Sequence, residues 1–421
     1  MTKTLVVMGL GYVGLPIAVR AVEHGYSVLG VEPDEQRRAL LGNSISHVGD
    51  VSNDRLGAAI SAGLKIVHTV DSGVGWDLAI IAVPTPLRDG VPDLSYVENA
   101  CVTLAKSVRA GSCVILESTS YPGTTREVVA GVLSDSSNVE LWNFDVGFSP
   151  ERIDPGNRLF GLENTPKIVS GLTPRALDRI DAFYRSIGLE TVIAQSCEAA
   201  ELAKLMENTF RQVNIALVNE ILVSARAMGI DPWESIELAS TKPFGFMRFN
   251  PGPGVGGHCL PIDPRYLSWI SAKRTGQTLR MIEVANSVNA NMPQYTAHRA
   301  QQMLDSGGWK SISPRQVTLI GAAYKANSTD CRESPTFEVA KLLIEMGHSV
   351  ALVDPLVAEV RAVVEGLEIS PWEAEQVATS DLVIVMTLHD VIPIDELIGA
   401  APLILDTRNA LAGRDFRGET L

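Results

Sequence analysis

The stretch "TLVVMGLGYVGLPIAVRAVEHGYSVLGVEP", Thr4 to Pro33, decides the fold of this chain. Its apolar, β-branched start predicts a strand over 4–8, and a glycine-rich turn then leads into an apolar helical segment. A turn at "EHG" and a second β-branched run predict another strand over 27–31. A strand, a helix and a second strand in this order form the βαβ unit of a doubly wound α/β sheet.

The turn inside this unit has the spacing of a dinucleotide-binding loop. Gly9, Gly11 and Gly14 follow the GxGxxG pattern, in which glycines let a pyrophosphate approach the backbone at a helix N-terminus. Glu32 ends the second strand, where a carboxylate can accept hydrogen bonds from ribose hydroxyls and repels a ribose phosphate. The pattern favours NAD over NADP, although Arg37 nearby keeps NADP open. The alternative is a glycine-rich turn that merely packs.

Alternation of short apolar runs with helical segments at both ends of the chain predicts parallel sheets covered by helices. The middle differs, because residues 197–229 form one long helical pattern, and residues 278–305 form another. We therefore expect an α/β protein in which a central helical domain (197–310), with a long connecting helix, joins two doubly wound Rossmann-like domains (1–196 and 311–421). The predicted strands are 4–8, 27–31, 77–83, 112–117, 145–149, 167–171 and 190–194, followed by 317–321, 349–353, 381–386 and 403–406.

The two ends of the chain resemble each other, which supports two domains of one architecture. They differ at the decisive turn, where the first end has "GLGYVG" and the second has "GAAYKA", so the first alone is expected to take a dinucleotide. The parallel segments are "EHGYSVLGVEP" (23–33) with "EMGHSVALVDP" (345–355), "DLAIIAVPT" (77–85) with "DLVIVMTLH" (381–389), and "CVILEST" (113–119) with "PLILDTR" (402–408).

Composition excludes several classes of function. The 421 residues carry a formal net charge of −14, which disfavours nucleic acid and membrane surfaces as partners. Glycines and Pro16 in the first apolar run argue against a secretion signal or a membrane span. Five widely spaced cysteines in a chain of this size fit reduced thiols, so we expect a cytoplasmic protein.

The long helical stretch offers a candidate catalytic pair. Lys204 and Asn208 are one helical turn apart, and the apolar residues around them leave little room for a broad solvated face. Lysine and asparagine together can hold a hydroxyl and then an oxyanion, as hydride transfer requires. The alternative is an ordinary charged stripe, formed by these two residues with Glu201 and Arg211.

A lone thiol follows a glycine- and proline-rich run in "NPGPGVGGHCLPIDP", residues 250–264. Cys259 could be a buried apolar residue, a metal ligand with His258, or a nucleophile. Bare backbone is poor core material, and no CxxC or HxxxH pattern supplies further ligands, so no metal is expected. A glycine-lined approach leaves space for a substrate, which favours the nucleophile.

Seven motifs together resemble the UDP-glucose/GDP-mannose dehydrogenase family over nearly the whole chain. The resemblance implies that the C6 alcohol of a nucleotide sugar, expected to be a UDP-sugar, is oxidised to the acid while two NAD are reduced. The motifs are "GLGYVGLPIA", "VPTP", "STSYPGTT", "SPERIDPGN", "AELAKLMENTFRQVNIALVNE", "PGPGVGGHCLPIDP" and "GAAYKANSTDCRESP".

Read through this resemblance, Cys259 is the thiolate that captures the intermediate aldehyde as a thiohemiacetal, whose oxidation gives a thioester for water to cleave. Lys204 stabilises the oxyanion, Asn208 helps to orient it, and Asp263 assists with water and charge. Thr119 and Glu151 match the family's water-positioning and proton-handling positions. These residues come from different segments, so we expect a site in the cleft between domains.

The resemblance also implies the binding residues and a homodimer formed through the central helical domain. The cofactor residues implied are Gly9, Gly11, Tyr12, Val13, Gly14, Glu32, Arg37, Pro84, Thr85, Thr119 and Arg332. The substrate residues implied are Glu151, Arg152, Ile153, Lys204, Asn208, Arg211, Phe249, Gly256, Tyr324, Lys325 and Arg408.

The sugar is less sharply indicated. "TKPFGF" and "SPERIDPGN" are most similar to the UDP-N-acetylglucosamine 6-dehydrogenase branch, whereas "ENTFRQVNIALVNE" is also similar to the UDP-N-acetylmannosamine branch. The UDP-glucose branch often has an acidic residue where this chain has Pro155, which argues against plain glucose. Tyr121 stands at an altered place in "STSYPGTT", with no physical reading from sequence.

Two other classes of function remain to be separated by experiment. A β-hydroxyacid dehydrogenase also combines a Rossmann domain, a helical domain and a Lys-x-x-x-Asn pair, but it performs one oxidation and needs no thiol. A non-catalytic NAD-sensing module would bind the cofactor without turnover. The number of NADH formed per substrate distinguishes these possibilities from a four-electron oxidation.

Overall fold

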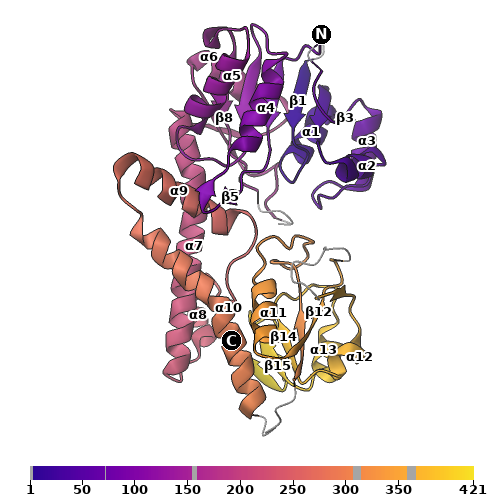
Figure 1. The fold of residues 1–421 in the computed structure, drawn as a ribbon, viewed down its shortest axis with the longest axis vertical. Coiled ribbons are helices and arrows are strands. Elements are labelled where there is room, and N and C mark those ends of the chain that lie inside the picture. The colour runs from indigo at the N-terminus through magenta and orange to yellow at the C-terminus, as the bar shows by residue number, and fades with distance from the viewer. Residues whose placement is uncertain (1–2, 72, 154–158, 307–313, 358–366) are drawn as a thin grey trace. The chain divides into compact units, whose positions relative to one another are not determined.

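A computed structural model describes residues 3–71, 73–153, 159–306, 314–357 and 367–421 (Figure 1). The chain forms two compact units, Met1–Glu207 with Arg265–Gln277, and Asn208–Pro264 with Thr278–Leu421. The predicted helical domain is thus shared between the two units. The predicted boundary between residues 310 and 311 lies outside the described residues.

The described part of the first unit contains an eight-stranded sheet in the order β10-β9-β8-β7-β4-β1-β2-β3 (Figure 1, indigo to magenta). The order around β1 is that of a dinucleotide-binding fold, with the switch point between β1 and β4. The strands are β1 (Thr4–Met8), β2 (Ser27–Val31), β3 (Lys65–Val67), β4 (Leu78–Ile81), β7 (Cys113–Leu116), β8 (Asp145–Phe148), β9 (Lys167–Gly171) and β10 (Thr191–Ile193).

Both faces of the central strands β4 and β7 are buried, which explains why these strands are apolar throughout rather than alternating. Leu5 and Val7 share one core cluster with residues of α1 (Gly14–Glu23) and α6 (Pro174–Ser186). The remaining elements of the unit are α2 (Glu35–Gly42), α3 (Asn53–Ser61), α4 (Ser95–Ala105), the π-helical turn Thr125–Val129, α5 (Ala130–Ser136), the 3-10 turn Leu141–Asn143, and the hairpin β5 (Leu87–Arg88) and β6 (Val91–Pro92).

Helix starts in this unit follow local capping chemistry. The side chains of Asp34, Ser52 and Thr173 accept hydrogen bonds from backbone N–H groups in the first turns of α2, α3 and α6. Such caps satisfy donors that have no partner inside the helix. Pro174 then occupies the first position of α6, where a missing N–H is tolerated.

The second unit repeats the architecture. Its described strands form a parallel sheet in the order β13-β12-β11-β14-β15-β16 (Figure 1, orange to yellow). They are β11 (Gln316–Ile320), β12 (Ser349–Val353), β13 (Ile369–Ser370), β14 (Leu382–Val385), β15 (Ile404–Asp406) and β16 (Gly418–Thr420). Residues of α10 (Arg280–Ser306) and α11 (Pro335–Glu345) cover one face, and residues of α12 (Ala374–Ala378) and α13 (Ile394–Ala400) cover the other.

Two further helices, α7 (Cys197–Ala227) and α9 (Cys259–Thr275), each contribute residues to both units, and α8 (Pro232–Ser240) belongs to the second. No described helix is both long and apolar enough to cross a membrane. The predicted α/β class with two doubly wound domains, a helical region and a long connecting helix is confirmed.

The three pairs of similar segments occupy equivalent places: β2 matches β12, β4 matches β14, and β7 matches β15. One prediction needs a correction, because β9 pairs with β8 in antiparallel orientation. No helix occurs among the described residues between these strands, whereas a parallel connection requires a crossover. Five short strands, β3, β5, β6, β13 and β16, were not predicted.

Candidate active site

The predicted cofactor residues of the first unit lie at the carboxyl ends of its parallel strands, where ligands bind in open α/β sheets. Gly9–Gly14 follows β1, Glu32 follows β2, Pro84 and Thr85 follow β4, and Thr119 follows β7. The loops after β1 and β4 approach closely, since a Cβ placed on Gly9 would lie 2.4 Å from the carbonyl oxygen of Ala82. Tyr12 and Val13 complete the turn into α1 and are half-buried.

Glu32 has the surroundings expected of a ribose-binding carboxylate. It is buried, and its Oε2 accepts the N–H of Leu10 at 3.3 Å. Its Oε1 accepts the N–H of Asp34 at 3.1 Å. Arg37 forms an ion pair with Glu32 at 3.2 Å. That pairing directs the guanidinium toward the carboxylate, which lessens its availability for a ribose phosphate.

Glu151, which follows β8, belongs to a cluster of charged side chains with Lys167 and Glu117. Lys167 Nζ lies 2.9 Å from Glu151 Oε2 and 3.1 Å from Glu117 Oε2, and the hydroxyl of Tyr184 donates to Glu117. Glu151 Oε1 accepts the N–H groups of Arg152 and Ile153 at 2.6 and 2.8 Å. Both oxygens of Glu151 are therefore held by named donors.

The two carboxyl groups of this cluster titrate differently. Burial would raise the pKa of Glu151, but the Lys167 cation and the two backbone donors outweigh it and lower that pKa. Burial raises the pKa of Glu117 to about 7 against the opposing effect of Lys167. Glu151 is consequently the more fully ionised of the two carboxyl groups at neutral pH. Sequence reasoning missed Glu117, Lys167 and Tyr184, although a glutamate directly after the apolar run "CVIL" was a usable signal for the first of them.

The long helix α7 carries the predicted Lys204 and Asn208 one turn apart. Both are buried, as is Glu201, whereas Arg211 is exposed, so these residues do not form a solvated stripe. Glu201 has a different role from its neighbours. Its carboxylate accepts the N–H groups of Gly123 and Thr125 at 2.6 and 2.8 Å, and thereby caps the turn that follows the "STSYPG" motif.

Asn208 and Asp263 meet in the second unit. The amide Nδ2 of Asn208 donates to Asp263 Oδ2 at 2.5 Å, and both side chains are buried. Asp263 lies on α9, one turn after Cys259, which is the first residue of that helix. The structure therefore brings the predicted amide, carboxylate and thiol segments together.

Cys259 differs from the other cysteines. All five lie among the described residues and none forms a disulfide, but Cys259 is exposed and the other four are buried. Burial raises the pKa of Cys101, Cys113 and Cys331 to about 12 and that of Cys197 to about 11. A helix N-terminus favours negative charge, so the position of Cys259 suits a thiolate.

The backbone of the glycine-rich segment before Cys259 packs closely against two predicted substrate residues, Tyr324 and Arg408. A Cβ on Gly256 would lie 2.6 Å from Cβ of Tyr324, and one on Gly252 would lie 3.1 Å from Nη1 of Arg408. The Nε of Arg408 donates to the carbonyl of Met386 at 2.8 Å, and burial lowers its pKa to about 10, so it is a cation at neutral pH.

The remaining predicted residues are more dispersed. Phe249 packs edge-on against Phe210, with ring centroids 5.8 Å apart, and Lys325 follows Tyr324 in a half-exposed position. Arg332 is exposed and pairs with Asp330 at 2.6 Å. Arg152 pairs with Glu207 at 2.7 Å, and Ile153 is half-buried. Pro155, the altered position of "SPERIDPGN", lies outside the described residues.

Tyr121, the other altered position, now has a physical explanation. Its ring is buried against Trp269 and Tyr266 of α9, at centroid distances of 5.2 and 6.4 Å. The aromatic side chain therefore packs the loop after β7 onto α9 within the first unit. Among the described residues, no group of three or more His, Cys, Asp or Glu side chains is arranged to hold a metal ion.

Comparison with known proteins identifies the family of this chain. Three domains of the UDP-glucose/GDP-mannose dehydrogenase family match consecutive parts of the chain. The NAD binding domain matches residues 3–188, the central domain matches 198–291, and the UDP binding domain matches 318–413. UDP-N-acetyl-D-mannosamine dehydrogenase of Methanococcus maripaludis is 33% identical over 97% of this chain and 93% of its own length. The chain belongs to the UDP-glucose/GDP-mannose dehydrogenase family.

Two further relatives show how far the likeness extends. The solved structure of UDP-D-ManNAc dehydrogenase from Pyrococcus horikoshii has a TM-score of 0.87 at 32% identity and covers 99% of both chains. NDP-N-acetyl-D-galactosaminuronic acid dehydrogenase of Ralstonia solanacearum is 32% identical over 92% of this chain and 91% of its own length. As a member of this family, the protein is an NAD-dependent nucleotide-sugar dehydrogenase with a UDP-sugar substrate.

The NAD assignment agrees with the geometry of the first unit. A Cβ placed on Gly11 would meet nothing within 4 Å, so the loop leaves open space beside its backbone where a pyrophosphate can approach. Glu32 stands at the end of the neighbouring strand, in the place of a ribose-binding carboxylate. The residues present therefore fit a dinucleotide.

Proposed function

We propose that this protein oxidises C6 of UDP-N-acetylmannosamine from the alcohol to the carboxylic acid in two steps. The sugar is proposed from the relatives of similar length that carry this name. Sequence motifs alone favoured UDP-N-acetylglucosamine, and the relatives shift that preference to the alternative. A single observation supports the two-step chemistry. The thiol of Cys259 is exposed, and it lies on α9 one turn before Asp263, which forms a buried pair with Asn208.

The proposed roles follow from side-chain chemistry. When bound, NAD accepts a hydride from C6 in each step. The Lys204 ammonium and the Asn208 amide stabilise the oxygen on C6 as it gains negative charge. The Cys259 thiolate adds to C6 of the aldehyde, and oxidation of this thiohemiacetal gives a thioester. Water cleaves the thioester, releasing the acid and the thiol.

Proton handling is assigned to two carboxylates. Asp263, held by Asn208, accepts a proton near the thiol, while Glu151 and Thr119 orient water in the first unit. Lys167 keeps Glu151 ionised, because its ammonium is 2.9 Å from Glu151 Oε2. The overall reaction consumes one alcohol, one water and two NAD, and yields one carboxylate, two NADH and three protons.

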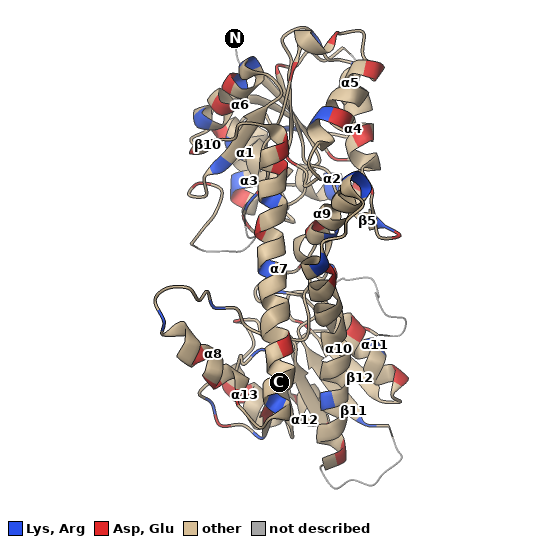
Figure 2. Cartoon of the chain, turned by 90° about the vertical axis from the view of Figure 1, so that its left-hand side faces the viewer, with Lys and Arg blue, Asp and Glu red and all other residues tan. Residues whose placement is uncertain are grey.

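A second copy of this chain is the proposed partner, through the helical region. On α7, Phe210, Leu217 and Ile221 lie on one face and are exposed by 47 to 52%, and Met281 and Val284 on α10 are exposed too. The polypeptide has no charged residue from Gln212 to Asn219, and Figure 2 shows much of α7 uncharged. An exposed apolar face of this kind favours association.

Substrate and stoichiometry can be measured in one experiment. The protein is incubated with NAD and each of UDP-N-acetylmannosamine, UDP-N-acetylglucosamine, UDP-N-acetylgalactosamine and UDP-glucose, and NADH is followed by absorbance. We expect the highest kcat/KM with the first sugar and two NADH per sugar consumed. Highest kcat/KM with another sugar contradicts the substrate, and one NADH per sugar contradicts the thioester route.

Cys259→Ser separates the thiol chemistry from cofactor binding. We expect the variant to form no acid while its Kd for NAD stays within about twofold of the wild-type value, because Gly9–Gly14 and Glu32 are untouched. Full acid production by the variant contradicts the role of the thiol. Loss of NAD binding together with activity would instead indicate a general structural defect.

A further inference from the structure

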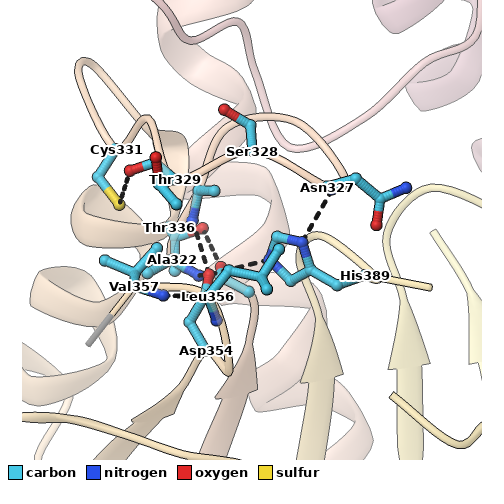
Figure 3. Close-up of polar contacts among 12 residues, drawn as sticks. Ala322, Asn327, Ser328, Thr329, Cys331, Thr336, Asp354, Leu356, Val357 and His389 are labelled. Carbon is cyan, nitrogen blue, oxygen red and sulfur yellow. Dashed lines mark hydrogen bonds and ion pairs between the residues drawn. The ribbon is translucent and has the colours of Figure 1, made fainter. Parts of the chain in front are cut away.

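Asp354 occupies the place in the second domain that Glu32 occupies in the first. Each carboxylate directly follows the second strand of its sheet, in "VDP" and "VEP". Asp354 is buried and accepts five hydrogen bonds (Figure 3). Its Oδ2 receives the N–H groups of Ala322 and Ala323 and the Nε2 of His389, at 2.8, 3.1 and 3.0 Å. Its Oδ1 receives the N–H groups of Leu356 and Val357 at 2.9 and 3.2 Å.

His389 occupies the place that Thr85 occupies in the first domain, as the aligned segments 77–85 and 381–389 show. The repeat thus replaces a glutamate and a threonine at a cofactor site by a buried Asp–His pair. Five donors exhaust the acceptor capacity of one carboxylate, so Asp354 has no oxygen left for a ribose. The pair therefore serves a different purpose from its counterpart.

The hydrogen bonds of His389 assign its protonation. Its Nδ1 lies 2.9 Å from the backbone N of Asn327, which is a donor, so Nδ1 must be the acceptor. The proton of the neutral imidazole then resides on Nε2 and is donated to Asp354. Because Asp354 is itself fixed by four backbone donors, it holds the ring in this tautomer.

The same residues fix a loop. Asn327 has a left-handed backbone with φ of 59°, and its Oδ1 accepts the N–H of Asp390 at 2.9 Å. Figure 3 shows the bond from the N–H of Asn327 to His389 Nδ1. Asn327 thus forms two hydrogen bonds with residues 389–390. The loop closes on itself through the N–H of Tyr324, which donates to the carbonyl of Asp330 at 3.1 Å.

This loop supports the segment that carries the thiol. The N–H of Gly257 donates to the carbonyl of Arg332 at 2.9 Å. A Cβ on Gly257 would lie 2.9 Å from Cζ of the Tyr324 ring, so the ring packs directly on that backbone. Gly257 is two residues from Cys259. A displaced loop would therefore disturb both Tyr324 and the approach to the thiol.

We propose that His389, oriented by Asp354, is a positioning residue that holds the Tyr324–Asp330 loop in its nucleotide-sugar-binding conformation through the acceptor Nδ1. The inference rests on the proposed function for its biological meaning, since Tyr324 and Lys325 are the proposed substrate residues of this loop. It goes beyond that function by assigning a role to a buried pair that contributes no atom to the reacting groups.

Two variants separate positioning from core filling. In His389→Asn, an amide oxygen can stand near the position of Nδ1 and accept from Asn327, whereas in His389→Gln the amide reaches the position of Nε2 and serves Asp354 alone. UDP binding is measured by calorimetry, because UDP needs no turnover. We expect His389→Gln to weaken UDP binding about tenfold or more and His389→Asn to keep its Kd within about threefold of the wild-type value. Equal weakening in both variants, or no change in either, overturns the proposal.

Thr318→Val is the matched control. Thr318 of β11 and Ser380, which lies between α12 and β14, share a buried hydrogen bond of 2.6 Å, and neither belongs to the loop. This variant should lower the unfolding temperature of the domain without weakening UDP binding. If it weakens UDP binding as much as His389→Gln, loss of domain stability explains the effect and the proposal fails.

A measurement on the wild-type protein covers the case in which the variants do not fold. Nitrogen-15 NMR of labelled histidines at neutral pH should show one imidazole with bare Nδ1 and protonated Nε2, and its signals should shift on addition of UDP. The opposite tautomer, or signals unmoved by saturating UDP, overturns the proposal. These readouts are independent of sugar oxidation, so wild-type turnover in the sugar panel tests the proposed function separately.

Discussion

At the scale of single residues, the proposed chemistry centres on one exposed thiol, which differs from the four buried ones. Four cysteines are buried in apolar surroundings that raise the pKa to about 11 or 12, and such thiols are inert at neutral pH. Cys259 is exposed at the start of α9. The fold thus confines reactivity to the position where the proposed reaction needs it.

Iodoacetamide should therefore label one cysteine. At pH 8 a thiol with a pKa of about 12 is ionised to only about one part in 10,000, so we expect Cys259 to react at least about 100 times faster than the buried cysteines. Peptide mass spectrometry gives the site and the rate, and NADH formation should be lost in step with labelling.

Cys331→Ser provides the control for this experiment. Cys331 is 9% exposed and is the most accessible of the other four, so it is the best competitor for the reagent. The variant should still take up one equivalent, and Cys259→Ser should take up none. Comparable labelling of Cys331 in the wild-type protein would remove the distinction between the two kinds of thiol.

Candidate residues that a local sequence pattern marks could be predicted from the sequence. Residues whose partners are distant in the chain could not. Spacing placed Lys204 and Asn208 on one helical turn, and a glycine-rich run marked Cys259. The pairing of Glu117 with Lys167 joins positions 50 apart in the chain, and no local pattern predicts it. The same holds for Tyr121, whose partners lie on α9.

At the scale of elements, the three glycines of the first loop have three different physical reasons. Gly9 has φ of 90°, which disfavours a side chain. Gly14 allows α1 to pack against the loop, because a Cβ there would lie 1.9 Å from the carbonyl oxygen of Gly9. Gly11 faces open space, so nothing within the chain requires a glycine there. We therefore propose that a bound ligand requires the glycine at position 11.

Gly11→Ala and Gly14→Ala should consequently separate binding from stability. We expect Gly11→Ala to leave stability within about 0.5 kcal/mol and to weaken NAD binding about tenfold or more, since its methyl group meets the pyrophosphate. Gly14→Ala should cost about 3 kcal/mol, because the clash is with backbone that cannot rotate away. Thermal unfolding and calorimetric titration with NAD measure the two effects.

The converse results would contradict this reading of the loop. Unchanged NAD binding in Gly11→Ala would mean that the open space is not where the pyrophosphate lies. Unchanged stability in Gly14→Ala would mean that the loop and α1 can separate without cost. UDP binding serves as the control, because its proposed site belongs to the second domain.

Long, strongly patterned elements were predictable, and short ones were not. The strand 4–8 and the long helix were predicted within two residues of their bounds, because apolar periodicity is decisive over such lengths. β3, β13 and β16 contain two or three residues each, too few to show a period. The antiparallel direction of β9 was missed because the composition of a strand does not encode its direction. The absence of a crossover helix among the described residues between β8 and β9 became evident only in the structure.

At the scale of the whole molecule, one architecture is used twice for different ligands. Both sheets have the same strand order around their first strand, and sequence similarity between the two ends predicted this. Recognition differs at matching positions, since Glu32 and Thr85 in one domain correspond to Asp354 and His389 in the other. We propose that a few side chains at the carboxyl ends of the strands decide which ligand each domain takes.

The helical region has an exposed apolar surface on α7, which is paired with α10. Within the second unit, side-chain amides join α7 to α10: Gln212 bonds Asn286, and Asn219 bonds Asn289 at 2.9 Å. This pairing leaves Leu217 and Ile221 exposed on the outer face of α7, by 52 and 47%. A rigid pair of helices with uncovered apolar side chains is suited to self-association.

We expect the wild-type protein to have twice the chain mass of 45.3 kDa by size-exclusion chromatography with light scattering. The double variant Leu217→Asp/Ile221→Asp should have the mass of one chain, because the two substitutions in each chain would bury four carboxylates in a symmetric dimer interface, at unfavourable cost. Val391→Asp, which changes another exposed apolar residue at 60% exposure in the second domain, should remain a dimer. A wild-type monomer, or a double variant that still dimerises, would show that the apolar face of α7 does not join two copies.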